Sequence, residues 1–170
     1  MTSGIKCFED FGVGDVIALG ETRVTAQDIV AFAAEFDPAP VHLGDTDAGA
    51  ALRPVAAPDG SEALVRVDGP IASNWHVGSI FMRVLFDGLL AGAQAKGSPG
   101  IEAATWPTPV RPGDTLGFSL QVLETKTSRS RPDLGLVLFG FRGVNQRGEP
   151  VLVARSWTMF GRRTGGSHVV

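Results

Sequence analysis

The segment from Ile71 to Leu90 constrains the fold more than any other part of the chain. Its large apolar side chains recur at helical spacing and leave one narrow polar stripe, which holds His76, Ser79, Arg83 and Asp87. A helix that is apolar around most of its circumference is normally buried, so other elements must wrap around it. Polar groups interrupt the segment too often for a bilayer span.

The elements that could wrap this helix are strands. Alternation of apolar and polar residues predicts a half-buried strand over residues 116–122, and further strands are predicted over residues 16–24, 101–110, 134–144 and 151–160. A long buried helix followed by a meander of strands predicts an α+β fold, with a curved antiparallel sheet wrapped around a long central helix.

We expect a single domain over residues 1–170. A chain of 170 residues, of which 44% are hydrophobic, can bury one full core. Three prolines and two glycines surround the strand-like piece 63–67, which predicts a loop, hairpin or lid inserted over about 44–70. Residues 162–170 are expected to form a flexible tail.

Charge and cysteine content exclude several classes of protein. The formal net charge is −3 and the basic residues are scattered, so nucleic acid is not an expected partner. Cys7 is the only cysteine, which leaves no intrachain disulfide and no cysteine cluster for zinc. Gly44–Asp47 lacks the ligand pattern of a calcium loop. With no signal sequence and no membrane segment in view, we expect a soluble, cytoplasmic protein.

Asp37 and His42 are the candidate catalytic residues. A capping-box-like sequence over residues 25–28 predicts a short helix, and the two prolines between Asp37 and His42 require it to stop near Phe36. We expect a stiff, extended corner after it, with the carboxylate at its start and the imidazole at its end. Such a pair suits general acid/base chemistry on a bound water. The alternative is that Asp37 only ends the helix and that His42 is a structural histidine.

The sequence around these residues resembles the MaoC-like acyl dehydratases, a family that includes the R-specific enoyl-CoA hydratases. The family signature runs Phe-Ala, a short gap, then Gly-Asp-x-Asn-Pro-x-His. The chain offers Phe32-Ala33 followed by Phe36-Asp37-Pro38-Ala39-Pro40-Val41-His42. Residues 69–76, 110–116 and 128–135 also resemble stretches of this family, so the resemblance extends over roughly residues 8–163.

This resemblance implies a hotdog fold, usually assembled as a homodimer or larger homo-oligomer with sites near the subunit interface. It also implies reversible addition of water to a trans-2-enoyl-CoA, giving a 3-hydroxyacyl-CoA of R configuration. Asp37 and His42 would hold the catalytic water, and which of them acts as base stays open. Backbone N–H groups near Ser73 and Asn74 would bind the thioester oxygen. The resemblance implies a CoA thioester substrate, with no metal and no redox cofactor.

Three departures from the family pattern motivate an alternative. The asparagine of the signature is Ala39, the glycine before the aspartate is Phe36, and the glycine expected after Ser73 is Asn74. A noncatalytic acyl-CoA-binding or assembly subunit is therefore one alternative to a hydro-lyase. A hotdog acyl-CoA thioesterase is another, although the complete Asp/His pair argues against it.

Some further polar residues carry weaker expectations. His76 is expected to be structural or to line the substrate site. Arg83 and Asp87 suit a plain ion pair along the helix. Arg129 and Arg131 could contact the phosphates of CoA, or could simply lie on a solvated loop.

Overall fold

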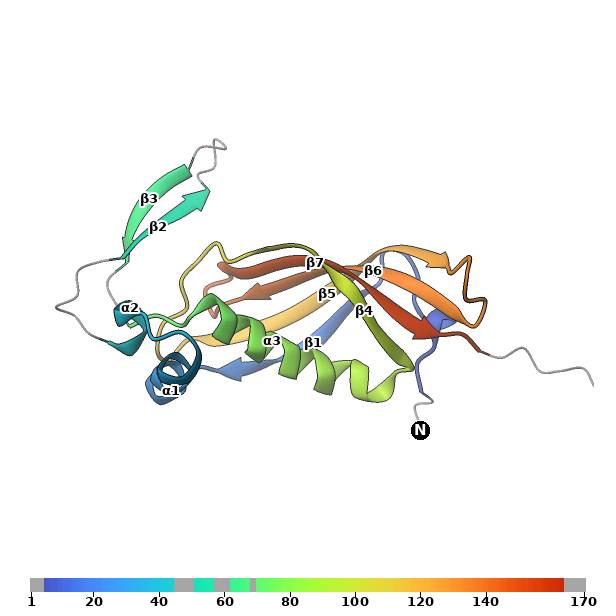
Figure 1. Ribbon diagram of the computed structural model, residues 1–170, viewed down its shortest axis with the longest axis horizontal. Coiled ribbons are helices and arrows are strands. Elements are labelled where there is room, and N and C mark those ends of the chain that lie inside the picture. The colour runs from blue at the N-terminus through green and yellow to red at the C-terminus, as the bar shows by residue number, and fades with distance from the viewer. Residues whose placement is uncertain (1–4, 45–50, 57–61, 68–69, 164–170) are drawn as a thin grey trace, which may run out of the picture.

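The main body of the protein is a five-stranded antiparallel sheet curved around one long helix (Figure 1). The computed structural model describes residues 5–44, 51–56, 62–67 and 70–163. The strand order is β1-β5-β6-β7-β4, and the strands are β1 (Val16–Arg23), β4 (Ala95–Thr105), β5 (Thr115–Thr127), β6 (Leu134–Val144) and β7 (Pro150–Gly161). The central helix is α3 (Asn74–Gly88). The predicted α+β architecture, a hotdog fold, is confirmed.

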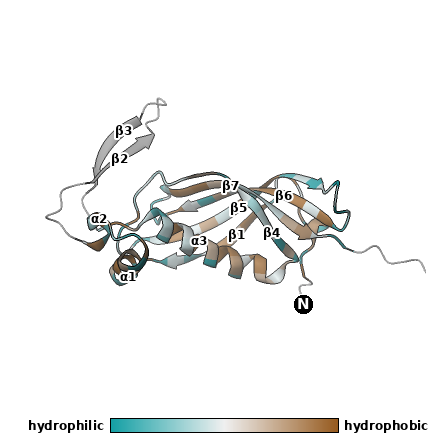
Figure 2. Ribbon diagram, viewed as in Figure 1, coloured by the Kyte–Doolittle hydropathy of each residue, from teal (hydrophilic) through white to brown (hydrophobic). Residues whose placement is uncertain are grey.

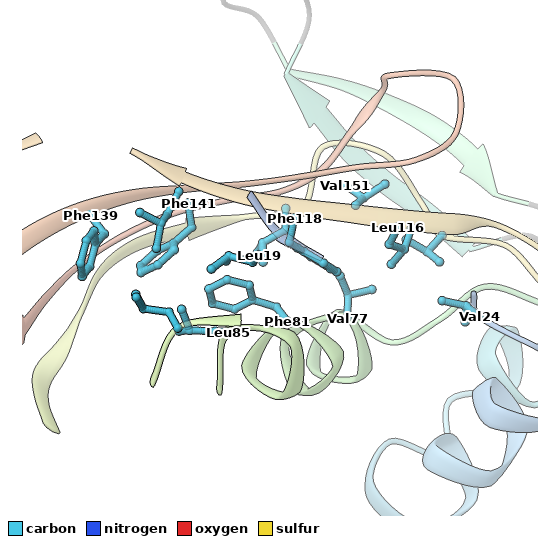
Figure 3. Packing of buried hydrophobic residues seen from close by; sticks show 14 of the residues in the cluster. Leu19, Val24, Val77, Phe81, Leu85, Leu116, Phe118, Phe139, Phe141 and Val151 are labelled. Carbon is cyan, nitrogen blue, oxygen red and sulfur yellow. The ribbon is translucent and has the colours of Figure 1, made fainter. Parts of the chain in front are cut away.

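Alternation along the strands gives the sheet its buried inner face. In β5, the four residues Leu116, Phe118, Leu120 and Val122 are all at most 3% exposed. Phe81 of α3 packs against the rings of Phe118 and Phe141 at centroid distances of 5.7 and 4.9 Å (Figure 3). Hydrophobic residues accordingly run along the strands of the sheet in Figure 2. Side chains of this size dominate the burial energy of a core, so this contact fixes how α3 sits in the curve of the sheet.

The strand predicted over residues 101–110 is displaced in the structure. β4 begins at Ala95 and ends at Thr105, before Pro107 and Pro109. Its first half contains Pro99 and two glycines in the left-handed region, Gly97 (φ 108°) and Gly100 (φ 143°). β4 is an edge strand with three register shifts against β7, and these residues lie where the register shifts. Edge strands tolerate proline and bulges, which is why the sequence pattern misplaced this one.

Smaller elements lie at the ends of the sheet. Helices α1 (Ala26–Phe36) and α2 (Pro40–Leu43) lie near the start of α3, and the short 3-10 helices η1 (Phe8–Asp10) and η3 (Leu90–Gly92) lie at the opposite end (Figure 1). The predicted insertion contains an antiparallel hairpin of β2 (Ala51–Ala56) and β3 (Glu62–Val67). The expected tail falls mostly outside the described residues. Within the described part of the chain, none of the helices has the length and apolar character needed to cross a membrane.

Candidate active site

Helix α1 delivers Asp37 to the site. Its N-terminus is the predicted capping box: the Asp28 N–H donates to Thr25 Oγ1 at 3.1 Å, and the Thr25 N–H donates to Asp28 Oδ2 at 3.0 Å. The helix ends with Asp37 as its C-cap, where the Asp37 N–H donates to the Ala33 carbonyl at 3.0 Å. The carboxylate therefore projects from a fixed helix end, as the sequence predicted.

The path from Asp37 to His42 differs from the extended corner expected from the two prolines. The chain is extended only as far as Ala39 (φ −68°, ψ 137°), and residues 40–43 then form the single helical turn α2. Pro40 occupies the first helical position, where its fixed φ suits a helix and its missing N–H costs nothing. Pro40 thus starts a helix instead of preventing one, and His42 projects from that turn.

Asp37 and His42 do lie together. His42 Nε2 is 3.5 Å from Asp37 Oδ2, and the side chains are 13% and 33% exposed, respectively. His42 Nδ1 is 2.8 Å from the carbonyl oxygen of Ile71, in the segment that leads into α3. The backbone also joins these segments, because the Ile71 N–H donates to the Val41 carbonyl at 3.2 Å. The imidazole is therefore held between the chain before α3 and the end of α1.

This arrangement selects one tautomer of the neutral His42 ring. A carbonyl oxygen can only accept, so Nδ1 must carry the proton that bonds Ile71. In the neutral imidazole Nε2 is then an unprotonated nitrogen facing the carboxylate of Asp37. Two acceptors face each other, and they need a shared proton or a hydrogen-bond donor between them. A water molecule that donates to both groups would satisfy both.

Ser73 completes the constellation. Its hydroxyl donates to Asp37 Oδ2 at 2.6 Å and accepts from the Trp75 N–H at 3.2 Å. Ser73 is the N-cap of α3 and is 1% exposed. The sequence did not predict the bond to Asp37, because the two residues are separated by 36 positions and no local pattern connects them. This bond leaves Asp37 Oδ2 with Ser73 on one side and His42 on the other.

The residues that depart from the family pattern have distinct surroundings. Phe36 is 64% exposed, and its ring packs on Phe32 at 5.0 Å, so it is not buried between Asp37 and His42. Ala39 is the N-cap of α2 and supplies no side-chain hydrogen bond. Asn74 is the first residue of α3 and is partly buried.

His76 lies beside this site and is buried. It is 7% exposed and stacks on the Phe32 ring at 4.8 Å with an interplanar angle of 10°. Burial lowers the pKa of His76, and the Asp28 carboxylate opposes this shift. Among the described residues, its Nδ1 has no hydrogen-bond partner. The predicted polar stripe on α3 thus has one buried member, His76, and an exposed pair further along the helix. Arg83 and Asp87 form the expected ion pair there at 2.7 Å.

Among the residues that the structure describes, no three His, Cys, Asp or Glu side chains are grouped to hold a metal ion. The chemistry available at this site is thus that of a carboxylate, an imidazole with a free Nε2 lone pair and a hydroxyl. The first turn of α3 adds a positive dipole end beside them.

Several solved structures are similar to this chain. A MaoC-like dehydratase from Rhodospirillum rubrum is 37% identical with a TM-score of 0.76, and the match covers 94% of this chain and 99% of that one. A monoamine oxidase regulatory protein from Archaeoglobus is 26% identical with a TM-score of 0.75, covering 96% and 99%. A Mycobacterium tuberculosis protein with a double hotdog fold is 17% identical with a TM-score of 0.69; the match covers 95% of this chain but 46% of that one, and it supports the fold alone.

No family model matches the sequence, and no curated protein matches it either.

Proposed function

Because the chain belongs to the MaoC-like dehydratase family, we propose that it is a hydro-lyase that reversibly adds water to the double bond of a trans-2-enoyl-CoA. The observation that carries the proposal is the Asp37, His42 and Ser73 constellation at the start of α3. The product would be a 3-hydroxyacyl-CoA, of R configuration as in the R-specific hydratases that the sequence resembles. The acting form would be a homo-oligomer.

In this mechanism His42 acts as the general base. Its Nδ1–H is engaged with the Ile71 carbonyl, so Nε2 is the atom that can accept a proton from water. The water oxygen attacks C3 of the enoyl group as the proton moves to Nε2. Asp37 accepts a hydrogen bond from the second O–H of the water, which stays bonded to oxygen, and so orients the nucleophile; its charge also stabilises the imidazolium. The proton then passes from the imidazolium to C2, which restores the neutral ring.

The developing charge falls on the thioester oxygen. Backbone N–H groups in the first turn of α3, near Ser73 and Asn74, would stabilise it together with the helix dipole. Because the Trp75 N–H already donates to Ser73 Oγ, Ser73 itself serves as a cap and as a donor to Asp37. Its role in the reaction is to hold the carboxylate in place.

The proposal is tested by the loss of enoyl-thioester absorbance across trans-2-enoyl-CoAs of increasing chain length. Asp37→Asn and His42→Ala should each lower kcat/KM by about 10²–10⁴-fold, the usual contribution of a general acid or base. Asp87→Asn, which removes an exposed carboxylate on α3, should retain wild-type turnover. Full activity in both dyad variants would reject the mechanism. Release of free CoA in the same assay would instead identify a thioesterase.

A noncatalytic acyl-CoA-binding subunit is the second candidate. Ala39 leaves α2 without a side-chain cap, and the Archaeoglobus neighbour is named a regulatory protein. This candidate predicts that the wild type binds acyl-CoA without turnover of any chain length and without release of free CoA.

A further inference from the structure

A hollow of about 480 Å³ lies between α1, the start of α3 and the end of β1. Helix α1 lines it through Asp28, Phe32 and Glu35, whose spacing of four and three residues places them on one face of the helix. Helix α3 lines it through His76 and Ile80, which are four residues apart and also share a face. Side chains from two helices therefore converge on one space.

His76 is the buried polar residue of this hollow. It is 7% exposed, and the Phe32 ring stacks flat on it at 4.8 Å, which fixes the plane of the imidazole. Its Nδ1 is enclosed and, among the residues that the structure describes, has no hydrogen-bond partner. Nε2 is therefore the ring nitrogen that can meet a ligand in the hollow.

The proton of the neutral His76 ring belongs on Nε2. Burial lowers the pKa of His76, so the ring is neutral near pH 7. An enclosed N–H without an acceptor is disfavoured more strongly than an enclosed lone pair, so the enclosed Nδ1 is the unprotonated nitrogen. Nε2 then carries an N–H, and an N–H needs a hydrogen-bond acceptor.

Charges of both signs stand around the hollow. Arg23, the last residue of β1, and Glu35, in the last turn of α1, both line it and are exposed. Neither forms an ion pair with any residue in the described part of the chain. Asp28 adds a second carboxylate, whose Oδ2 accepts from the N–H and the hydroxyl of Thr25. A ligand that satisfies these groups must carry an anionic group for Arg23 and a cationic group for the carboxylates.

The ligand must also be larger than an ion. Asp28, Glu35 and His76 are not grouped closely enough to hold a metal ion, a finding that covers the described residues. The volume of the hollow lies within the range of small-molecule sites, and Phe32 and Ile80 add apolar surface to it. A carboxylate, an ammonium group and an aliphatic group in one small molecule are the parts of an aliphatic α-amino acid.

We propose that this hollow is a second ligand site, which binds an aliphatic α-amino acid. The carboxylate of the ligand accepts hydrogen bonds from the Arg23 guanidinium and from the His76 Nε2–H. Its ammonium group is held by Asp28 and Glu35, and its side chain packs on Ile80. The site goes beyond the proposed reaction, because the ligand is neither a thioester nor a reactant of the dyad.

The first test is calorimetry of the wild type with three compounds that differ by one charged group. L-Leucine carries both charges, isocaproate lacks the ammonium group and isoamylamine lacks the carboxylate. We expect L-leucine to bind and each analogue to bind at least about tenfold more weakly, because each loses a charge-assisted contact. No binding of L-leucine at millimolar concentration, or equal binding of all three compounds, overturns the proposal.

The second test removes the charges of the hollow one at a time. Arg23→Gln and Glu35→Gln change exposed side chains, and each should weaken L-leucine binding about tenfold. Arg155→Gln and Glu102→Gln are the matched controls, because they change an exposed arginine and an exposed glutamate that pair with each other elsewhere. Both controls should bind L-leucine like the wild type. Wild-type affinity in Arg23→Gln and Glu35→Gln, or an equal loss in the controls, overturns the proposal.

A third variant tests the buried donor. His76→Phe keeps an aromatic ring against Phe32 but removes the Nε2–H, so it should weaken L-leucine binding about tenfold while circular dichroism shows the native fold. A folded His76→Phe with wild-type affinity overturns the proposal. If this variant does not fold, the two exposed variants of the hollow decide the matter.

The last comparison separates this site from the dyad. The described residues that line the hollow include none of Asp37, His42 and Ser73. Asp37→Asn should therefore bind L-leucine with wild-type affinity, whereas a loss of binding would place the amino acid at the dyad and overturn the second site. Calorimetry needs no turnover, so the result does not depend on whether the protein is a hydratase.

Discussion

In the candidate site, Asp37 Oδ2 contacts both His42 and Ser73, and the bond from Ser73 holds the carboxylate in its orientation. The Ser73 hydroxyl donates to this oxygen at 2.6 Å, while its lone pair caps α3. Ser73→Ala should therefore lower kcat about tenfold with little change in KM, because the carboxylate loses its orientation but the substrate contacts stay. It should also cost about 1 kcal/mol of stability through the lost cap.

Ser79→Ala is the matched control for this prediction. Ser79 lies on the same helix and donates to the Trp75 carbonyl, but it is exposed. Steady-state kinetics and urea denaturation of both variants separate the two roles. Equal kcat values in the two serine variants would refute the positioning role of Ser73.

His76 should make folding sensitive to acid. Burial lowers its pKa in the folded protein below the ordinary value near 6.5, so the unfolded chain binds the proton more readily. The stability that this group contributes is fully present above about pH 6.5 and is lost as the pH falls below it. His76→Leu should therefore reduce the loss of unfolding free energy between pH 7 and pH 5, as measured by urea denaturation. An identical loss in wild type and variant would show that His76 is not the cause.

At the scale of elements, two glycines of α3 should respond oppositely to the same substitution. A Cβ at Gly88 would overlap the backbone of Leu19 in β1, so the helix end approaches the sheet at a distance that only glycine permits. Gly88→Ala should destabilise the protein by about 1–3 kcal/mol through overpacking. Gly78 has open space around its Cβ position, so Gly78→Ala should stabilise it by about 0.5–1 kcal/mol through helix propensity. Thermal or urea denaturation measures both, and a shift of the same sign in the two variants would contradict the close approach of α3 to β1.

Features of the fold that are set by residues close together in the sequence could be predicted from local patterns. The capping box of Thr25 and Asp28 and the alternation in β5 both act over a few positions, and both were predicted correctly. β4 was misplaced because its proline and glycines are acceptable only at a sheet edge, a property of the whole fold. The bond from Ser73 to Asp37 joins the start of α3 to the end of α1, so it could be found only from the tertiary structure. The dyad was predicted from a short motif, and its hydrogen-bond partners were not.

At the scale of the whole molecule, the two edges of the sheet allow a direct test of how copies assemble. Val16 on β1 and Ile101 on β4 are both 69% exposed, and each lies on an edge strand. A lysine at either position is compatible with the folded protomer, because both side chains already face solvent. Only the edge that pairs with a second copy should be affected by a charge, because assembly would bury it.

We expect Ile101→Lys to convert the oligomer to a monomer, as measured by light scattering after size-exclusion chromatography, while Val16→Lys leaves the assembly intact. The reverse pattern, with assembly lost in Val16→Lys alone, would place the interface at β1.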